Sequence, residues 1–181
     1  QVSKLLVRGV QIPALGIALE GMPYGTSIPV LGDFLRLTYI ENSGMAFGID
    51  VGGKVFFSIF SLVASAAIII YLYRVRTAPL GFRLALSMIL GGALGNLVDR
   101  MFYGIIFGYG PLFGGRVIDF IDVDFFTIEL FGYHLSRFWV FNVADASVTV
   151  GVILLLVFHQ IGVSEDTPVP PATPTTPPVT L

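Results

Sequence analysis

The stretch that decides the fold class is VFFSIFSLVASAAIIIYLY, residues 55–73, which contains no charged side chain. A membrane crossing needs about 20 mostly apolar residues, because an α-helix rises about 1.5 Å per residue across a hydrocarbon core about 30 Å thick. Residues 55–73 meet this requirement without interruption. We therefore predict a membrane-spanning α-helix over this stretch.

Two further stretches are predicted to span the membrane, at residues 82–100 and 138–158. Arg74, Arg76 and Arg83 lie around the loop between the first two spans, which holds no acidic residue. Because basic residues concentrate in cytoplasmic loops, this loop is predicted to be cytoplasmic. The residues before the first span and the loop 101–137 after the second are then expected outside the cytoplasm.

The composition of the whole chain agrees with a membrane protein. Hydrophobic residues make up 55% of the 181 residues and charged residues only 12%, about half of the share that a soluble domain usually carries. The formal net charge of −2 argues against a nucleic-acid partner. The chain has no cysteine, which excludes disulfides, a cysteine nucleophile and thiolate metal sites.

The segments outside the spans differ from one another in composition. Residues 9–54 mix glycine, proline and β-branched residues in short alternating runs, which predicts a small extracytoplasmic β-rich lobe beside the outer loop 101–137. Residues 164–181 are rich in proline and threonine and are predicted to form a disordered tail. The expected fold is an all-α membrane bundle with this lobe, in one membrane-embedded domain over residues 1–163.

The second predicted span contains GGALG, residues 91–95. Small residues four positions apart let two helix backbones approach closely. Since no predicted strand precedes the run, close helix packing is predicted in preference to phosphate binding.

Several polar side chains fall inside or at the ends of the predicted spans. Asp145 lies seven residues into the third span, with Asn142 on the same helix face. Asn96 and Arg100, four residues apart in the second span, also share a face, beside Asp99. An ionisable group at membrane depth is unfavourable by about 3 kcal/mol on insertion scales, and therefore indicates function.

The outer loop segment RVIDFIDVDFF adds Asp119, Asp122 and Asp124 near the same end of the bundle. Two carboxylates close together do not both ionise readily, so one retains a proton. Such a pair can hydrolyse a peptide bond: the ionised group takes a proton from water, and the protonated group donates to the carbonyl oxygen. The spacing does not choose among the three loop acids, although Asp122 and Asp124 are typical of solvated loop residues.

Other chemistries find less support in the sequence. There is no HExxH or GxSxG motif, and His134 and His159 lie far apart, so neither a metal site nor a Ser–His pair is predicted. Three roles for Asp145 remain open: catalysis, structural pairing with Arg100, and a proton relay in a small proton-coupled transporter that uses both residues. Asp99 is expected to form a structural ion pair with the adjacent Arg100 or a helix cap.

Five segments, in order along the chain, resemble the motifs of one family. They are QVSK (1–4), ENSGMAFG (41–48), GNLVDR (95–100), RVIDFID (116–122) and FNVADASVTVG (141–151). Together they resemble lipoprotein signal peptidase (signal peptidase II), a bacterial inner-membrane aspartic protease, over nearly the whole chain except the tail. The family has four spanning helices. The resemblance therefore implies three complete helices and the stub of a first one, in an N-terminally incomplete copy.

The resemblance implies roles for particular residues. Asp119 and Asp145 match the catalytic pair of the family, which decides among the three loop acids. The other matches imply roles in positioning the substrate and supporting the pair: Asn42, Gly44, Asn96, Asp99, Arg100 and Asn142. The amides would orient the aspartates, and Arg100 would pair with Asp99 or with substrate carbonyls.

The activity implied by the resemblance is removal of signal peptides from diacylglyceryl-modified prolipoproteins by a cut before the lipidated cysteine. No metal or other cofactor is implied. The implied partners are the lipid-modified substrate and membrane lipid, without nucleic acid. The chain is expected to act as a monomer in the bacterial cytoplasmic (inner) membrane, with its active site near the extracytoplasmic face.

Overall fold

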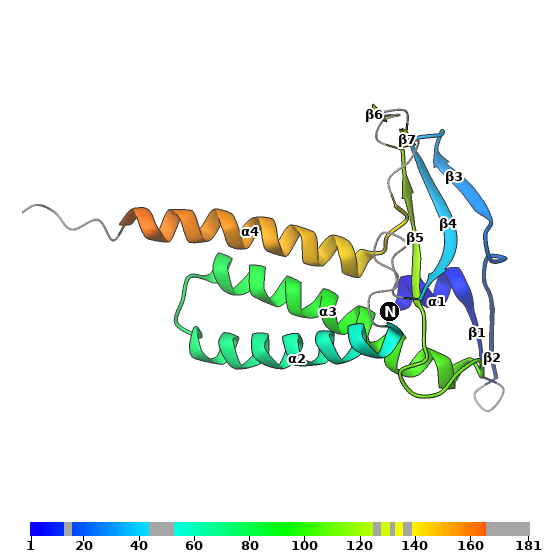
Figure 1. Ribbon diagram of the computed structural model, residues 1–181, viewed down its shortest axis with the longest axis horizontal. Helices are drawn as coiled ribbons and strands as arrows, with labels where there is room; N and C mark the ends of the chain where they lie inside the picture. The colour runs from blue at the N-terminus through cyan, green and yellow to red at the C-terminus, as the bar shows by residue number, and fades with distance from the viewer. Residues whose placement is uncertain (13–15, 44–52, 125–127, 131–132, 136–138, 166–181) are drawn as a thin grey trace, which may run out of the picture.

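The computed structural model describes residues 1–12, 16–43, 53–124, 128–130, 133–135 and 139–165. Its elements, in chain order, are α1 (Val2–Arg8), β1 (Gly9–Ile12), β2 (Ile17–Glu20), β3 (Ser27–Leu31), β4 (Leu35–Asn42), α2 (Gly53–Arg74), α3 (Leu80–Ile106), β5 (Val117–Val123), β6 (Ile128–Leu130), β7 (Tyr133–Leu135) and α4 (Val143–Glu165). The long helices α2, α3 and α4 pack in a row, and the strands stand at one end of them (Figure 1).

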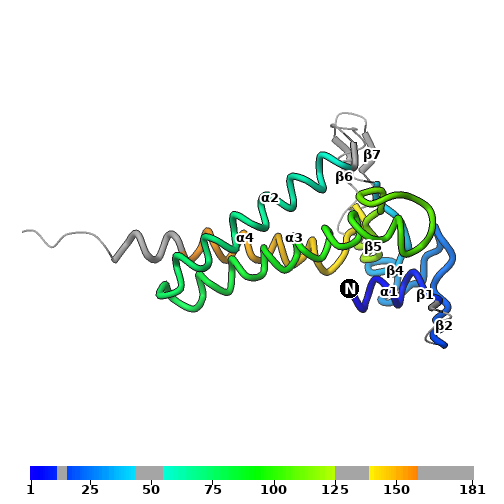
Figure 2. Tube along the Cα trace, turned by 90° about the horizontal axis from the view of Figure 1, so that it is seen from below, coloured from blue at the N-terminus to red at the C-terminus, as the bar shows by residue number. Residues whose placement is uncertain are grey.

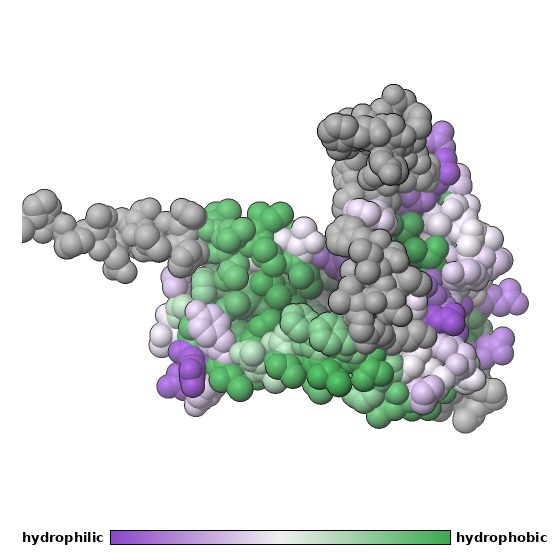
Figure 3. All heavy atoms as spheres, viewed as in Figure 1, coloured by the Kyte–Doolittle hydropathy of each residue, from purple (hydrophilic) through white to green (hydrophobic). Residues whose placement is uncertain are grey.

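In the described part of the chain, α2 and α3 are long and apolar enough to cross a membrane, over Val55–Arg74 and Leu80–Ile106. On α2, Phe56, Ile59 and Phe60 are each more than half exposed. A helix with such an apolar surface and little protein around it is suited to lipid. Figure 3 shows hydrophobic residues covering the long helices, and hydrophilic residues at the turn between α2 and α3. The helix predicted at residues 55–73 is confirmed.

Two predicted helix boundaries are wrong. The second helix does not end at residue 100 but continues to Ile106, after which Gly108 turns the chain with a φ of 71°. The last helix begins at Val143 and not at residue 138, because Phe141 forms an antiparallel bridge to Ile121 of β5. Its apolar stretch, Val143–Phe158, is shorter than the two spanning candidates, so a third membrane crossing stays a prediction.

Helices α3 and α4 pack closely because glycines lie at their contact. A Cβ added to Gly92 would lie 2.6 Å from Val148 Cγ2 and closer still to the Ala144 carbonyl oxygen. A Cβ added to Gly151, farther along α4, would lie 2.8 Å from the carbonyl oxygen of Ala85. The close packing predicted from GGALG is confirmed at Gly92 and Gly95, whereas a Cβ added to Gly91 would meet nothing within 4 Å. Helix α2, by contrast, diverges from α3 toward the strands (Figure 2).

The strands form an antiparallel β1–β2 hairpin, a three-stranded antiparallel sheet of order β3–β4–β5, and a β6–β7 hairpin. Strands β1 to β4 lie within the β-rich region predicted from residues 9–54, of which residues 13–15 and 44–52 are not described. Its location outside the cytoplasm stays a prediction. In the central sheet, β4 pairs with β5 so that Ile40 lies opposite Asp119.

Asp122 belongs to strand β5 and is buried, so the prediction that it is a solvated loop acid is wrong. Its carboxylate accepts a hydrogen bond of 2.7 Å from the Thr38 hydroxyl on the neighbouring strand. All residues of β5 except Ile121 are buried. Burial on both faces of this strand explains why its sequence lacks a simple alternation of polar and apolar residues.

The short helix α1 joins the helices to the sheet. Its Val7 packs in a buried cluster with Tyr39 of β4, Tyr103 of α3, and Ile118 and Phe120 of β5. This core anchors α1 against the strand end of α3. The seven residues of α1 form a helix at the start of the chain; that this helix is the stub of a spanning one stays a prediction.

Candidate active site

Asn142 and Asp145 define the first turn of α4. The Asn142 side-chain oxygen accepts hydrogen bonds from the backbone N–H groups of Ala144 (2.7 Å) and Asp145 (3.3 Å). In return, Asp145 Oδ2 accepts from the Asn142 backbone N–H over 3.1 Å. This reciprocal pattern is a capping box, which satisfies N–H groups that a helix start otherwise leaves free. Asp145 therefore lies at the helix start and not seven residues inside it, as the sequence had predicted.

Asp119 lies in the middle of β5, on the strand that faces the start of α4. Its side chain is buried, with an exposed fraction of only 2%. Burial raises the pKa of Asp119 to about 6; the charge of Asp145 adds to the rise, whereas hydrogen bonds from Asn142 and Asn42 oppose it. Asp119 thus has a carboxyl group poised to hold a proton close to a second carboxylate.

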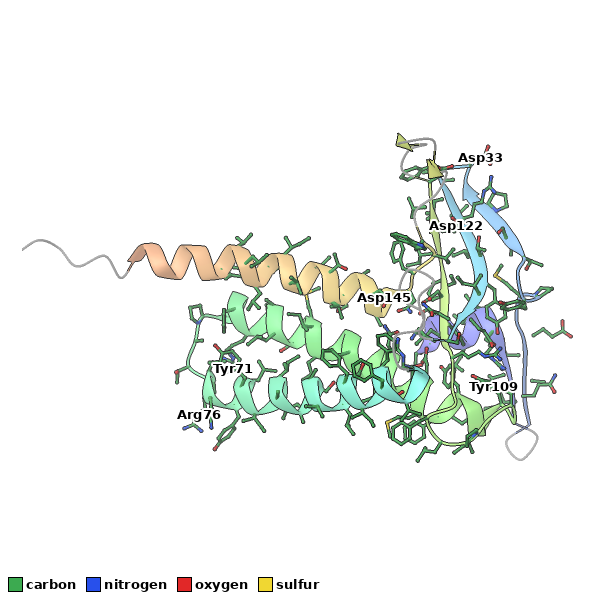
Figure 4. All side chains as sticks on the ribbon, in the orientation of Figure 1. Asp33, Tyr71, Arg76, Tyr109, Asp122 and Asp145 are labelled. Atoms are coloured by element: carbon green, nitrogen blue, oxygen red, sulfur yellow. The ribbon has the colours of Figure 1, made fainter. Side chains whose placement is uncertain are left out.

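Two asparagine amides link these carboxylates. Asn142 Nδ2 donates to Asp119 Oδ1 over 2.6 Å, and Asn96 Nδ2 donates to Asp145 Oδ1 over 2.7 Å. The amides also contact each other, with Asn142 Nδ2 lying 3.2 Å from Asn96 Oδ1. Strand β5, helix α3 and the start of α4 therefore hold the two acids through one hydrogen-bonded unit. In Figure 4, Asp145 lies at the end of α4 next to the strands, and Asp122 lies farther along the sheet.

Lys4 of α1 belongs to the same network, and the sequence analysis did not assign it a role. Its ammonium donates to Asn96 Oδ1 over 2.8 Å and to Asp99 Oδ2 over 2.5 Å. Asp99 Oδ2 also accepts from the Ile118 backbone N–H over 3.2 Å. The side chains of Lys4 and Asp99 are almost completely buried. The one sequence signal that contained Lys4 was the QVSK segment.

The predicted pairing of Asp99 with Arg100 is wrong, because Asp99 pairs with Lys4. Consecutive helical residues point about 100° apart, so they do not face each other. Arg100 is half-buried, and its charge interacts with Asp145 and Asp119 as well as with Asp99. Across the described ranges, no acid lies within ion-pair distance of Arg100, and its buried Nε has no hydrogen-bond partner. The guanidinium thus adds positive charge near both carboxylates without being bound to either.

Of the two remaining predicted residues, Asn42 lies at the site and Gly44 is not described. Asn42 lies at the end of β4 and hydrogen-bonds to Asp119. Gly44 lies outside the described residues. The structure therefore brings seven of the eight predicted side chains or positions to one place, namely Asn42, Asn96, Asp99, Arg100, Asp119, Asn142 and Asp145. Within the described ranges, no group of three His, Asp or Glu side chains is placed to hold a metal ion.

A comparison with protein families gives a match over nearly the whole described chain. The family model described as signal peptidase (SPase) II matches residues 1–161.

The chain belongs to the signal peptidase II family.

The resemblance predicted from the five motifs is thereby confirmed. Proteins named lipoprotein signal peptidase are similar in sequence. That of Chlorobium phaeobacteroides (strain BS1) is 34% identical over 139 residues, which covers 77% of this chain and 80% of the relative. That of Halothermothrix orenii is 36% identical over 143 residues, which covers 78% and 81%.

Two solved structures, each described as a bacterial membrane enzyme, share the fold of this signal peptidase II family member. One is 34% identical with a TM-score of 0.61, covering 81% of this chain and 77% of that structure. The other is 32% identical with a TM-score of 0.63, covering 92% and 86%. Membership of a peptidase family removes the support for the transporter alternative. It also weighs against a purely structural pair of Asp145 and Arg100, which lack a direct ion pair.

Proposed function

We propose that this chain is an aspartic endopeptidase that removes signal peptides from diacylglyceryl-modified prolipoproteins, cutting before the lipidated cysteine. Membership of the signal peptidase II family supports the substrate class. The observation that carries the aspartic chemistry is the joint binding of Asp119 and Asp145 by the amides of Asn142 and Asn96.

In the proposed mechanism, Asp119 and Asp145 share one proton and a water molecule between them attacks the scissile carbonyl carbon. The ionised carboxylate takes a proton from this water, while the protonated carboxyl donates its proton to the carbonyl oxygen. A tetrahedral diol results. The carboxyl that received the proton then gives it to the leaving nitrogen as the C–N bond breaks. At the same time the other carboxylate takes a proton from one diol hydroxyl, so that a carboxylic acid forms and the pair again holds one proton.

The neighbouring residues have supporting roles in this proposal. Asn96 and Asn142 fix the carboxylates in orientation, and Lys4 holds the Asn96 oxygen so that its amide nitrogen faces Asp145. The positive charge of Arg100 stabilises the ionised member of the pair and attracts substrate carbonyl oxygens. Asn42 and Gly44 are proposed to position the substrate.

The proposed setting is the outer surface of the bacterial cytoplasmic (inner) membrane. Arg74, Arg76 and Arg83 lie near the α2–α3 turn, at the opposite end of the helices from Asp119 and Asp145, and such a charge distribution favours a cytoplasmic turn. A lipid-anchored peptide would present its scissile bond at this boundary, where the bound acyl chains hold it near the pair. We propose a monomer with lipid and prolipoprotein as its partners and with no cofactor.

The test compares wild type with Asp119→Asn and Asp145→Asn on a diacylglyceryl-modified lipobox peptide in detergent. Asp122→Asn is the matched control, because it removes a buried carboxylate from the same strand three residues farther on. We expect both catalytic variants to lose cleavage by at least about 10⁴-fold while remaining folded and binding the peptide, and Asp122→Asn to cleave. Cleavage by Asp119→Asn or Asp145→Asn would contradict the assignment, as would equal loss in Asp122→Asn.

A further inference from the structure

A hollow lies away from the two aspartates, between the β1–β2 hairpin and the strand end of α3. Its volume is about 690 Å³, and its lining includes Arg8, Leu19, Glu20, Ile105, Ile106 and Phe107. None of these residues contacts Asp119 or Asp145 through a hydrogen bond in the described chain. We refer to this space as the Arg8 hollow.

Two contacts fix the orientation of the Arg8 guanidinium. The guanidinium carbon lies 3.3 Å from the centroid of the Phe107 ring, and Nε donates to Glu41 Oε1 over 3.3 Å. In the part of the chain that the structure describes, the hydrogen bond of this side chain comes from Nε, which leaves its terminal nitrogens for a ligand. A guanidinium fixed in this way offers a fork of N–H donors that matches two oxygens of a phosphate.

The Glu41 carboxylate beside the Arg8 hollow does not compensate Arg8 alone. Glu41 is shared, because its Oε2 also accepts from Arg116 over 3.3 Å while Oε1 accepts from the Tyr39 hydroxyl over 2.7 Å. Two guanidinium groups thus face one carboxylate. Because Glu41 is divided between Arg8 and Arg116, the Arg8 guanidinium keeps attraction for an anion, while Glu20 in the lining offers a carboxylate to a cationic group.

The other wall of the Arg8 hollow is apolar and lies at a membrane boundary. Helix α3 has 27 residues and is therefore about 40 Å long, more than a hydrocarbon core of about 30 Å. With the α2–α3 turn at one membrane surface, the Ile106 end of α3 reaches the headgroups of the other. There Ile105 and Ile106 are 55% and 58% exposed. The hydrophobic surface of the long helices continues to this end of α3 (Figure 3). A ligand here would meet a cation and an apolar surface together.

We propose that the Arg8 hollow binds a phosphatidylethanolamine molecule of the surrounding membrane. The phosphate would lie on the Arg8 guanidinium, and the acyl chains would follow Ile105 and Ile106. Glu20 lines the same hollow, and its carboxylate fits the ammonium of the ethanolamine headgroup. This lipid site is separate from the proposed catalytic pair, and its occupation does not require peptide cleavage.

The test is a titration of the full chain in detergent with phosphatidylethanolamine and with phosphatidylglycerol, counting bound lipids by native mass spectrometry. Charge-assisted hydrogen bonds of a bidentate pair correspond to about 10- to 100-fold in affinity. We expect Arg8→Gln to lose at least about tenfold for both lipids, and Arg8→Lys, which keeps the charge but lacks the fork, to lose less. Glu20 is exposed, so Glu20→Gln should leave the fold intact. This variant should abolish the preference for phosphatidylethanolamine.

Arg76→Gln is the matched control, because Arg76 also lies near an aromatic ring, that of Tyr73, but at the other end of the helices. It should bind both lipids as wild type does. Equal binding by wild type and by folded Arg8→Gln and Arg8→Lys would overturn the proposal. Competition by soluble glycerophosphoethanolamine at the same concentration as the lipid would overturn the role of the apolar wall, and equal affinity of wild type for the two lipids would overturn the role of Glu20.

Discussion

Replacing Gly92 with alanine tests whether the spacing of α3 and α4 holds the two carboxylates in place. A Cβ at residue 92 would lie 2.6 Å from Val148 Cγ2 and closer still to the Ala144 backbone carbonyl oxygen, which a side-chain rotation cannot move away. Carbon atoms pack at about 3.5–4.0 Å. The helices must therefore separate by about 1 Å at this point. One turn farther along α3, Asn96 donates to Asp145 over 2.7 Å, and a separation of about 1 Å would stretch this contact beyond the hydrogen-bond range.

We expect Gly92→Ala to lower the cleavage rate by about 100-fold, because a misplacement of about 1 Å near reacting groups has an effect of that order. The free energy of unfolding should fall by about 1–3 kcal/mol, as for other overpacked positions. The assays are single-turnover cleavage of the diacylglyceryl-modified peptide and thermal unfolding in detergent.

Gly91→Ala is the matched control, because the same methyl group added one residue earlier meets nothing within 4 Å. It should leave cleavage unchanged and stabilise the helix by up to about 1 kcal/mol. Normal cleavage by Gly92→Ala would refute the reasoning from helix spacing. An equal loss of cleavage in Gly91→Ala would show that the backbone freedom of glycine, and not the interhelical distance, is what matters.

Three further predictions concern Asp119 and Lys4. Because the pKa of Asp119 is raised to about 6, kcat/KM should decline as the pH rises through about 6 and the pair loses its shared proton; a flat profile between pH 5 and 8 would contradict this. Because the pKa of Asp119 is higher in the folded state than in the unfolded state, ionisation of Asp119 destabilises the fold as the pH rises above the unfolded-state pKa. In thermal unfolding, Asp119→Asn should therefore be more stable than wild type at pH 7.5 by up to about 3 kcal/mol, and this difference should vanish below about pH 4. Lys4→Met leaves Asp99 buried without its cation and should lower the free energy of unfolding by about 3–5 kcal/mol in chemical denaturation, with partial recovery in Lys4→Met/Asp99→Leu; no loss in the single variant would show that the pair is not stabilising.

The elements with one dominant physical cause could be predicted from the sequence. The helix at residues 55–73 follows from uninterrupted apolar character, and the structure has it at Gly53–Arg74. The start of α4 could not be placed in this way, since the apolar residues before Asn142 conceal a helix cap. The end of α3 was missed because the polar residues up to Arg100 resemble the end of a span. The helix continues through residues 101–106, which are mostly apolar.

The candidate site shows the same division between local and tertiary causes. Asp145 could be singled out by its position in an apolar segment, but Asp119 and Asp122 are both buried in β5, so burial alone does not separate them. The family resemblance made that choice, and the hydrogen bond from Asn142 agrees with it. Lys4 was overlooked because its contact with Asn96 joins residues 92 positions apart, a proximity that no local pattern contains.

The direction of the hydrogen bonds around Asp119 and Asp145 has a consequence for where a proton can reside. An ammonium can only donate, so Lys4 fixes Asn96 with its oxygen inward and its nitrogen toward Asp145. The hydrogen bonds that Asn142 and Asn96 make to the two carboxylates are likewise donated by N–H groups, and the bond from Asn42 lowers the pKa of Asp119, as a donated bond does. A carboxylic proton on either acid therefore finds no acceptor among these donor groups. It is directed toward the unoccupied lone pairs, where it remains available to whatever molecule enters between the acids.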